Sequence, residues 1–488
     1  MCGIIGVISD DGSPVFRELA NGAHFLQHRG PAYAGLFVSD PARRECELVK
    51  GEGLADDIFK RLDELEGDVG LAHTRYKTIG AGGRENAQPF FDPYSGIALA
   101  HNGHITNTEQ IARQLADAGQ RLRADCDAES LLRVLALWFE HHRRAALGAP
   151  EPEIMFRAIG EVLDRVTGAY SVVVATREGL YAFRDPNGFR PMVFGTRERG
   201  DGRLLMVASE TIALEQNGYG VEEEIPGGWA MFVDRHLERT TIQIAPADPR
   251  PCAFELIYFA DVDSTMFGER IRTFRWRAGK ALALYVAELD PELVRSIDLV
   301  VPIPHSPIPG AEAFAQTLEK TFDDLALQYA TPVSKYRYGG RVFMEETQAA
   351  RDEAAMLDFR VDVKAVQGKR VFLVDDSIVR GTNARRIVTA MRRAGAVSVH
   401  LGVLWPMVID SCFQGINTPT RMELIGSRLN GDEAAICREL GLDGLFYLPV
   451  AVFRERVIKN APACMACATG QRAVKFEFPG SVIPSMAG

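Results

Sequence analysis

The residue best placed to do covalent chemistry is Cys2, which follows Met1 and precedes a glycine. A small second residue allows the initiator methionine to be removed, which would leave Cys2 with a free α-amine. Such an amine has a pKa of about 7.7–8.0 and can accept the proton of the neighbouring thiol, so the residue carries its own base. Taken alone, however, a cysteine in this position is better explained as a buried structural thiol.

Several short motifs downstream favour a catalytic Cys2. Together with the segments NAQPF and FRDPNGFRP, they resemble the class II, N-terminal nucleophile glutamine amidotransferases. The resemblance implies that Arg75 binds the glutamine carboxylate and Asp127 its α-ammonium, and that Asn102 and the backbone N–H of Gly103 form an oxyanion hole. These residue types suit those roles, because arginine binds a carboxylate through two hydrogen bonds and paired N–H donors stabilise a tetrahedral oxyanion. The motifs are His28-Arg29-Gly30, His73-Thr74-Arg75-Tyr76, His101-Asn102-Gly103 and Asp127-Ala128-Glu129.

A second chemical signal is an apolar run, Val371–Val374, that ends in two carboxylates and a short turn. The turn and the N-terminus of the helix expected after it would bind a phosphate through backbone N–H groups. The carboxylates Asp375 and Asp376 cannot bind phosphate, but they suit the hydroxyls of a ribose and Mg²⁺. The pattern therefore predicts a ribose 5-phosphate site whose turn residues are Ser377, Arg380, Gly381 and Thr382.

This turn resembles the phosphoribosyl pyrophosphate (PRPP) motif of type I phosphoribosyltransferases. From Cys2 to about Gly470 the chain is similar to the glutamine PRPP amidotransferase family. The resemblance implies that glutamine is hydrolysed at Cys2 and that ammonia crosses an internal channel to C1 of PRPP. The products would be 5-phosphoribosylamine, glutamate and pyrophosphate, in the first step of purine synthesis. The residues implied to contact PRPP or Mg²⁺, besides the turn, are Asp375, Asp376, Ser306 and Arg341.

Two departures from that family leave other functions open. The chain has His305-Ser306 where the family has an acidic residue, and the acidic segment Asp352–Asp358 where it has a basic run. Less positive charge weakens pyrophosphate binding. One alternative is a paralogous amidotransferase that uses a different phosphosugar or acceptor. The other is a non-catalytic regulatory or binding relative with the same fold.

The resemblance implies a metal site at four further cysteines, Cys252, Cys412, Cys464 and Cys467, although the Cys464-x-x-Cys467 pair alone is also compatible with a redox pair or with chance. Eight cysteines in so long a chain do not make a disulfide scaffold. Four thiolates suit either Zn²⁺ or an iron–sulfur cluster, so the residue types do not separate the two. In one branch of the family these four positions hold a [4Fe–4S] cluster, and the resemblance therefore favours that cluster over Zn²⁺.

In the first half of the chain, short apolar strands alternate with a few amphipathic helices, of which Thr106–Ala118 and Ala128–His142 are the clearest. Apolar residues recur every three or four positions in these helices. The pattern predicts an α+β domain with antiparallel sheets, and the resemblance implies the four-layer αββα arrangement of N-terminal nucleophile enzymes. The expected strands are Ile4–Ile8, Gly70–His73, Gly96–His101, Ala169–Thr176, Gly179–Arg184 and Leu204–Ala208.

The second half changes character after a proline-rich stretch, Ile244–Cys252. Continuous apolar strands, beginning with Leu299–Ile303, then alternate with helical patterns at Ala311–Phe322 and Asn383–Ala394. This order predicts an α/β domain with a mostly parallel sheet. We therefore predict a glutaminase domain over residues 1–245 and a phosphoribosyltransferase-type domain with a cysteine-containing tail over residues 246–488.

Composition argues against several classes of protein. The 488 residues carry a net charge of -10, so a general nucleic-acid binder is not expected. No apolar run reaches about 18 residues, and the N-terminus does not resemble a signal peptide, so we expect no membrane partner and a cytoplasmic location. The expected partners are small molecules, glutamine and PRPP. The resemblance further implies a homo-oligomer, a tetramer or a dimer, and inhibition by purine nucleotides.

Overall fold

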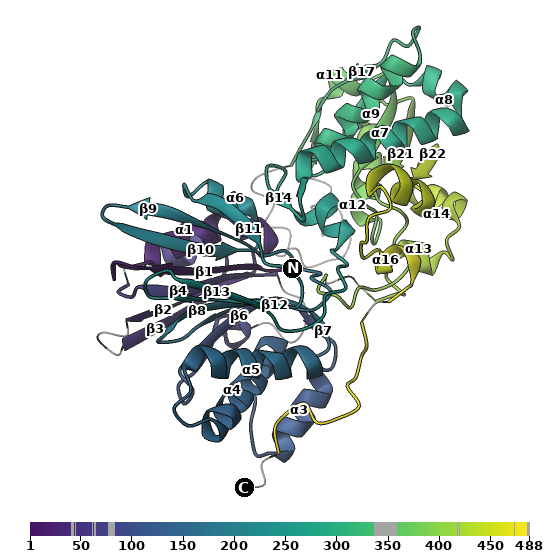
Figure 1. Ribbon diagram of the computed structural model, residues 1–488. Helices are drawn as coiled ribbons and strands as arrows, with labels where there is room; N and C mark the ends of the chain where they lie inside the picture. Colours follow the sequence, from purple (N-terminus) through teal and green to yellow (C-terminus); the bar gives the residue numbers. More distant parts are fainter. Residues whose placement is uncertain are drawn as a thin grey trace, which may run out of the picture.

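The computed structural model has two antiparallel sheets in its first half and a parallel sheet in its second (Figure 1). This arrangement confirms the predicted fold class. The structure describes residues 1–40, 43, 45–60, 62, 65–76, 83–335, 359–416, 418, 420–472 and 474–485.

The first sheet is antiparallel and has seven strands. Helices α1 (Phe16–Phe25), α2 (Ala55–Phe59) and α6 (Thr211–Glu215) accompany it, and the apolar residues of α1 and α6 pack on its outer face. The register sets Gly3 opposite Thr74 and Tyr33 opposite Arg75, which brings the start of the chain beside the end of β4. The strand order is β11 (Gly220–Glu224), β9 (Val193–Arg199), β10 (Gly202–Ala208), β1 (Gly3–Ser9), β4 (Val69–Arg75), β2 (Tyr33–Asp40) and β3 (Glu45–Glu52).

The second antiparallel sheet packs against the first through buried side chains of both. Helices α3 (Thr108–Asp117), α4 (Asp127–Ala145) and α5 (Glu151–Arg165) cover its other face, which completes the αββα layers. The strand expected over Gly96–His101 runs from Ile97 to Ile105, because its pairing with β7 continues to Gly168. The order is β13 (Arg239–Gln243), β12 (Trp229–Asp234), β8 (Gly179–Arg184), β7 (Gly168–Ala175), β6 (Ile97–Ile105) and β5 (Phe90–Asp92).

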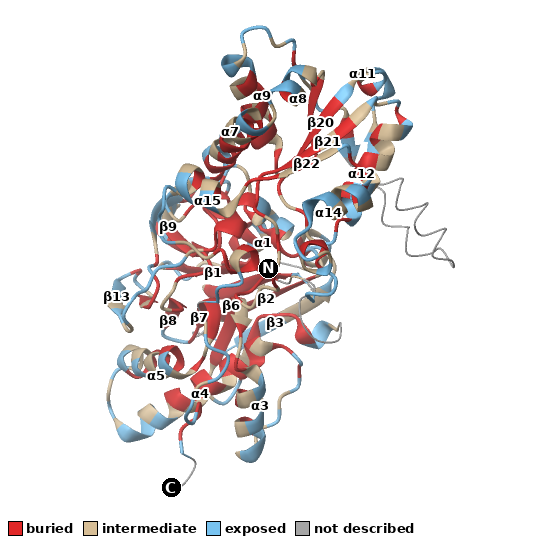
Figure 2. Cartoon of the chain, turned by 90° about the vertical axis from the view of Figure 1, so that its right-hand side faces the viewer, coloured by how far each residue is buried: buried red, intermediate tan, exposed pale blue. Residues whose placement is uncertain are grey.

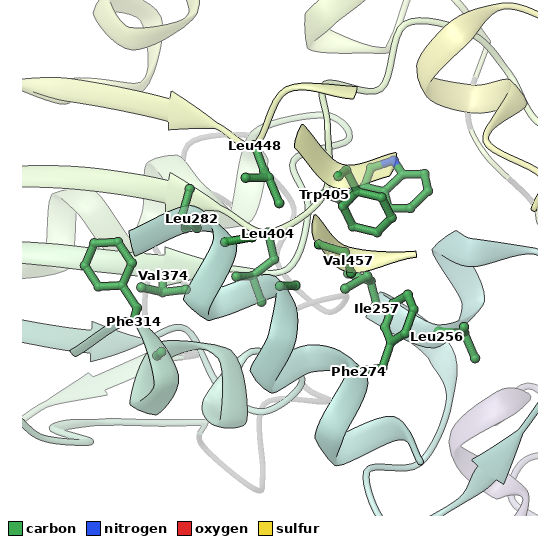
Figure 3. Packing of buried hydrophobic residues seen from close by; sticks show 14 of the residues in the cluster. Leu256, Ile257, Phe274, Leu282, Phe314, Val374, Leu404, Trp405, Leu448 and Val457 are labelled. Atoms are coloured by element: carbon green, nitrogen blue, oxygen red, sulfur yellow. The ribbon is translucent and has the colours of Figure 1, made fainter. Parts of the chain in front are cut away.

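The five strands of the third sheet are all parallel. Helices α7 (Ile271–Leu289) and α9 (Ile308–Thr321) pack on one face, where Phe314 stacks on Phe372, while α12 (Thr382–Arg393) and α14 (Glu433–Leu440) cover the other. Figure 3 shows Phe314, Val374, Leu404 and Trp405 in the core on the first of these faces. The order is β17 (Gln328–Tyr329), β16 (Leu299–Pro302), β20 (Arg370–Asp375), β21 (Ser398–Val403) and β22 (Gly444–Tyr447).

The end of the chain returns to the first half. After α16 (Ala466–Thr469), an extended tail passes along α3 and α4, where Trp138 Nε1 donates to the carbonyl of Val482 at 2.9 Å. Figure 2 shows that buried residues concentrate in the strands, whereas the outer helices carry the exposed ones. Among the residues that the structure describes, no helix is both long and apolar enough to cross a membrane.

Candidate active site

Cys2 lies immediately before β1 and is almost wholly buried, with 7% of its surface exposed. Its backbone N–H donates to Asn102 Oδ1 at 3.2 Å, and its carbonyl accepts from Arg29 Nε at 2.8 Å. These contacts hold the backbone of the predicted nucleophile between β6 and the turn that follows α1. The sequence separation of 100 residues between Cys2 and Asn102 is closed by the packing of one sheet on the other.

Asn102 and Gly103, the residues predicted to form the oxyanion hole, lie in β6, and Asn102 contacts the backbone of Cys2. The Asn102 side chain is fully buried, and its Nδ2 has no hydrogen-bond partner within the described residues. A Cβ at Gly103 would come within 1.9 Å of the Ala169 carbonyl oxygen, so only glycine fits there. An unused buried N–H donor suits a negative charge that develops only during the reaction.

The two residues predicted to bind the glutamine backbone atoms lie on neighbouring elements. Arg75 ends β4, is 3% exposed, and stands with its guanidinium 5.8 Å from the centre of the Tyr33 ring. Asp127 begins α4 and accepts from the N–H of Ile105 at 3.0 Å. Although burial opposes its ionisation, nearby His101 holds the pKa of Asp127 below its ordinary value. The carboxylate is therefore ionised and suited to an ammonium group.

A buried ionic network beside Cys2 was not assigned from the sequence. Arg29 forms ion pairs with both Glu210 and Glu255, and Arg190 Nη1 lies 2.8 Å from the other oxygen of Glu255. His28 contacts Glu210 at 3.0 Å. Of these residues, His28, Arg29 and Arg190 fall within the motifs that carried the family resemblance. Their pairing, however, joins positions between 65 and 226 apart and is visible only in the fold.

The four predicted cluster cysteines come together from three parts of the chain. Cys252 and Cys464 form a parallel β-bridge, and the carbonyl of Cys467 accepts a hydrogen bond of 2.8 Å from Ile409. Burial raises the pKa of Cys252 to about 12 and that of Cys464 to about 11, and the nearby Cys412 contributes to both shifts. Within the described ranges, no three His, Cys, Asp or Glu side chains are placed to hold a single metal ion.

The predicted phosphate turn joins β20 to α12 and lines a cavity of about 670 Å³. Gly381 caps the helix with φ +79°, a conformation that favours glycine. Burial raises the pKa of Asp376 to about 6, although hydrogen bonds from Ser377 and Ser306 partly offset the shift. The cavity brings together all the PRPP and Mg²⁺ residues predicted in the described part: Asp375, Asp376, Ser306, Ser377, Arg380, Gly381 and Thr382.

The same cavity reaches the first half of the molecule. His28 and Tyr76 line it, together with Tyr258 and Arg275 from the second half. His28 also pairs with Glu210 of the buried ionic network, so one wall of the cavity adjoins that network. No sequence signal pointed to Arg275, which lies in a helical pattern. The predicted PRPP contact Arg341 lies outside the described residues.

Comparisons with known proteins agree with this arrangement. A family model described as "Glutamine amidotransferase domain" matches residues 73–216. The chain is 34% identical to the amidophosphoribosyltransferase of Synechococcus elongatus, over 96% of this chain and 90% of that protein. It is 33% identical to the amidophosphoribosyltransferase of Methanocaldococcus jannaschii, over 98% of both chains.

A solved structure resembles the whole fold. The glutamine PRPP amidotransferase from B. subtilis, complexed with ADP and GMP, superposes with a TM-score of 0.82. The superposition covers 99% of each chain at 29% sequence identity. The similarity therefore extends over both halves of the molecule and is not confined to the region that the glutamine amidotransferase domain matches.

Proposed function

Because this chain belongs to the amidophosphoribosyltransferase family, a group of glutamine-dependent transferases, we propose that it hydrolyses glutamine at Cys2 and delivers the ammonia to C1 of PRPP. The products are 5-phosphoribosylamine, glutamate and pyrophosphate. The observation that carries the proposal is the 670 Å³ cavity, which His28 and Tyr76 line on one side and Asp375 and Asp376 on the other. The cavity therefore places residues of the glutaminase half beside the predicted PRPP residues, where the ammonia would be used.

The first stage uses groups around Cys2. Burial lowers the pKa of the Met1 α-amine to about 6. Once Met1 is removed, we expect burial to lower the pKa of the Cys2 α-amine in the same direction, which would let this amine accept the thiol proton. The thiolate attacks the amide carbon, and Asn102 Nδ2 and the Gly103 N–H stabilise the oxyanion. Ammonia leaves, and water then frees glutamate from the thioester.

The second stage uses the phosphate turn. The N–H groups at the start of α12 bind the 5-phosphate, and the carboxylates of Asp375 and Asp376 orient the ribose hydroxyls. We propose that these carboxylates, with Ser306, also hold Mg²⁺, which would neutralise the pyrophosphate as it leaves. Ammonia arriving through the cavity forms the new bond to C1 as the bond to pyrophosphate breaks.

We further propose that Cys252, Cys412, Cys464 and Cys467 hold a [4Fe–4S] cluster. Four cysteine thiolates suit either an iron–sulfur cluster or Zn²⁺, and the family relationship favours the cluster. The cluster would tie α16 to the bridge at Cys252. Iron, sulfide and zinc analysis of anaerobically purified protein tests this, and stoichiometric zinc without iron would refute it.

Glutamate release measured with and without PRPP and Mg²⁺ tests the catalytic proposal, with Cys2→Ala as the control. We expect PRPP to stimulate glutamate release and pyrophosphate to appear with it. Glutaminase activity that ignores PRPP would favour a paralogue with another acceptor. If the protein shows no activity after Met1 has been removed, that result would favour a non-catalytic relative.

The family relationship also leads us to propose a homo-oligomer, a tetramer or a dimer, that works in the cytoplasm and responds to purine nucleotides. Light scattering at several protein concentrations, with and without nucleotide, measures the oligomer directly. A monomer at all concentrations would contradict the proposal.

A further inference from the structure

Arg190 is a buried cation whose hydrogen bonds are incomplete. It has no exposed surface, and its Nη1 donates to Glu255 Oε2 at 2.8 Å. Its Nε and Nη2 find no partner in the part of the chain that the structure describes. Leaving charged donors buried and unpaired is costly, so the site calls for a further acceptor.

Glu255 does not supply that acceptor. Its Oε1 pairs with Arg29 and its Oε2 with Arg190, so both oxygens are already engaged. The Arg190 donors that remain unused are Nε and Nη2, and no second carboxylate pairs with them among the described residues. Two hydrogen-bond donors of Arg190 are therefore left without an acceptor in the described part of the protein.

The cysteine set lies next to these unused donors. The N–H of Cys252 donates to the carbonyl of Phe189, the residue before Arg190, at 3.3 Å. On the loop that carries Cys412, a Cβ at Gly415 would lie 3.4 Å from Arg190 Nε. One segment that supplies a cysteine therefore passes the Arg190 guanidinium group, and another is hydrogen-bonded to the backbone just before Arg190.

We propose that Arg190 is the counter-cation of the cysteine set, and that its Nε–H and Nη2–H donate to the sulfur atoms of the cluster which those cysteines hold. This inference rests on the cluster proposed above. A cluster with four thiolate ligands carries net negative charge, and hydrogen bonds to its sulfurs stabilise the reduced form. Arg190 is thus a positioning residue, since through Glu255 and Arg29 it also joins the cluster to the backbone of Cys2.

The test compares Arg190→Met and Arg190→Lys with the wild-type full chain. The measurements are iron retained against a chelator and the midpoint potential of the cluster. Loss of an outer hydrogen bond typically weakens metal binding about 10–100-fold, so we expect Arg190→Met to retain iron roughly tenfold less well. Its midpoint potential should become more negative. Arg190→Lys keeps the charge but not the planar pair of donors. Its iron retention and midpoint potential should therefore lie between those of the wild type and of Arg190→Met.

Arg184→Met is the matched control. Arg184 is also a buried arginine of the same segment, but it donates to the backbone carbonyls of Ile225 and Gly188. Its loss should lower stability without changing the iron retained per folded chain or the potential. An unchanged potential and chelator resistance in Arg190→Met would overturn the inference. If Arg190→Met does not fold, Arg190→Lys provides the test. A midpoint potential and chelator resistance identical to those of the wild type would then overturn the inference.

The outcome for the wild type separates this inference from the proposed function. If the wild-type protein contains no iron, both the cluster and the role of Arg190 are refuted. The glutamate and pyrophosphate assays report on catalysis independently. If the wild type contains iron but Arg190→Met changes neither iron retention nor the midpoint potential, only the role of Arg190 is refuted.

Discussion

Asn102 has two polar side-chain atoms, Oδ1 and Nδ2, with different roles at the candidate site. Its Oδ1 accepts from the N–H of Cys2, while its Nδ2 is buried and unused among the described residues. Removing one oxyanion donor costs about 10²–10³ in kcat, so Asn102→Ala should lower the kcat for glutamate release by that factor and leave the KM for glutamine within about threefold. Asn107→Ala is the control, because that equally buried asparagine bonds only to the loop at Arg165 and Thr167 and to Gln110. A larger effect on KM than on kcat would argue against an oxyanion hole.

Asp376 predicts a pH dependence at the residue scale. Burial raises its pKa to about 6, so the carboxylate that would bind Mg²⁺ or ribose becomes protonated as the pH falls below 6. The PRPP-dependent kcat/KM should then fall about tenfold per pH unit below that value. The measurement is the pH profile between 5 and 8 at saturating glutamine. A profile that stays flat down to pH 5 would show that Asp376 ionises normally.

The raised pKa of Asp376 also determines how the stability of the protein depends on pH. A carboxyl whose folded pKa lies above its unfolded value is less favourable when ionised in the folded state, so its charge costs stability above pH 6 and costs none below about pH 4. Asp376→Asn should therefore raise the thermal stability at pH 7 while lowering PRPP-dependent activity. Equal loss of stability and activity would mean that the ionised carboxylate supports the fold instead.

At the scale of elements, the start of α12 depends on the conformation of Gly381. Its φ of +79° disfavours other residues, and a Cβ there would lie 2.8 Å from Ile425 Cδ1. Gly381→Ala should cost about 1–3 kcal/mol of stability and also raise the KM for PRPP, because the turn N–H groups shift. Gly368→Ala is matched in strain, with φ +73°, but its Cβ meets open space far from the phosphate turn. Equal effects of the two variants on the KM would contradict a phosphate-binding role for the turn.

The elements also show what the sequence could predict. The continuous apolar runs around Val371–Val374 predicted the parallel sheet, because strands buried on both faces have no polar alternation. The motif at Asn102 predicted the residues beside Cys2, but not that they lie inside a strand that extends to Ile105. Strand ends depend on pairing with a partner, here β7, and periodicity within one segment does not contain that partner.

At the scale of the whole molecule, the least predictable features join distant parts of the chain. Arg29 meets Glu255 across 226 positions, and the cavity combines Tyr76 with Asp375. Such pairs have no local signature, since a lone arginine or glutamate in a sequence is usually a solvated surface residue. The domain boundary at residue 245 stays a prediction, and the tail adds a connection across it that composition did not suggest.

That tail gives the last prediction. Val482 and Ile483 are buried in the core formed with α3 and α4, and the N–H of Val482 donates to Gln114 Oε1 at 2.7 Å. Val482→Asp would place a carboxylate in this core, so the tail should detach instead, with the loss of about 2–3 kcal/mol of apolar burial. We expect a lower Tm, faster amide exchange in α3 and α4, and unchanged basal glutamate release, because the tail lies away from Cys2. Ser485→Asp, at an exposed position of the same tail, is the control. If the exchange rates of α3 and α4 stay the same in Val482→Asp, the tail does not stabilise the helices on which it lies.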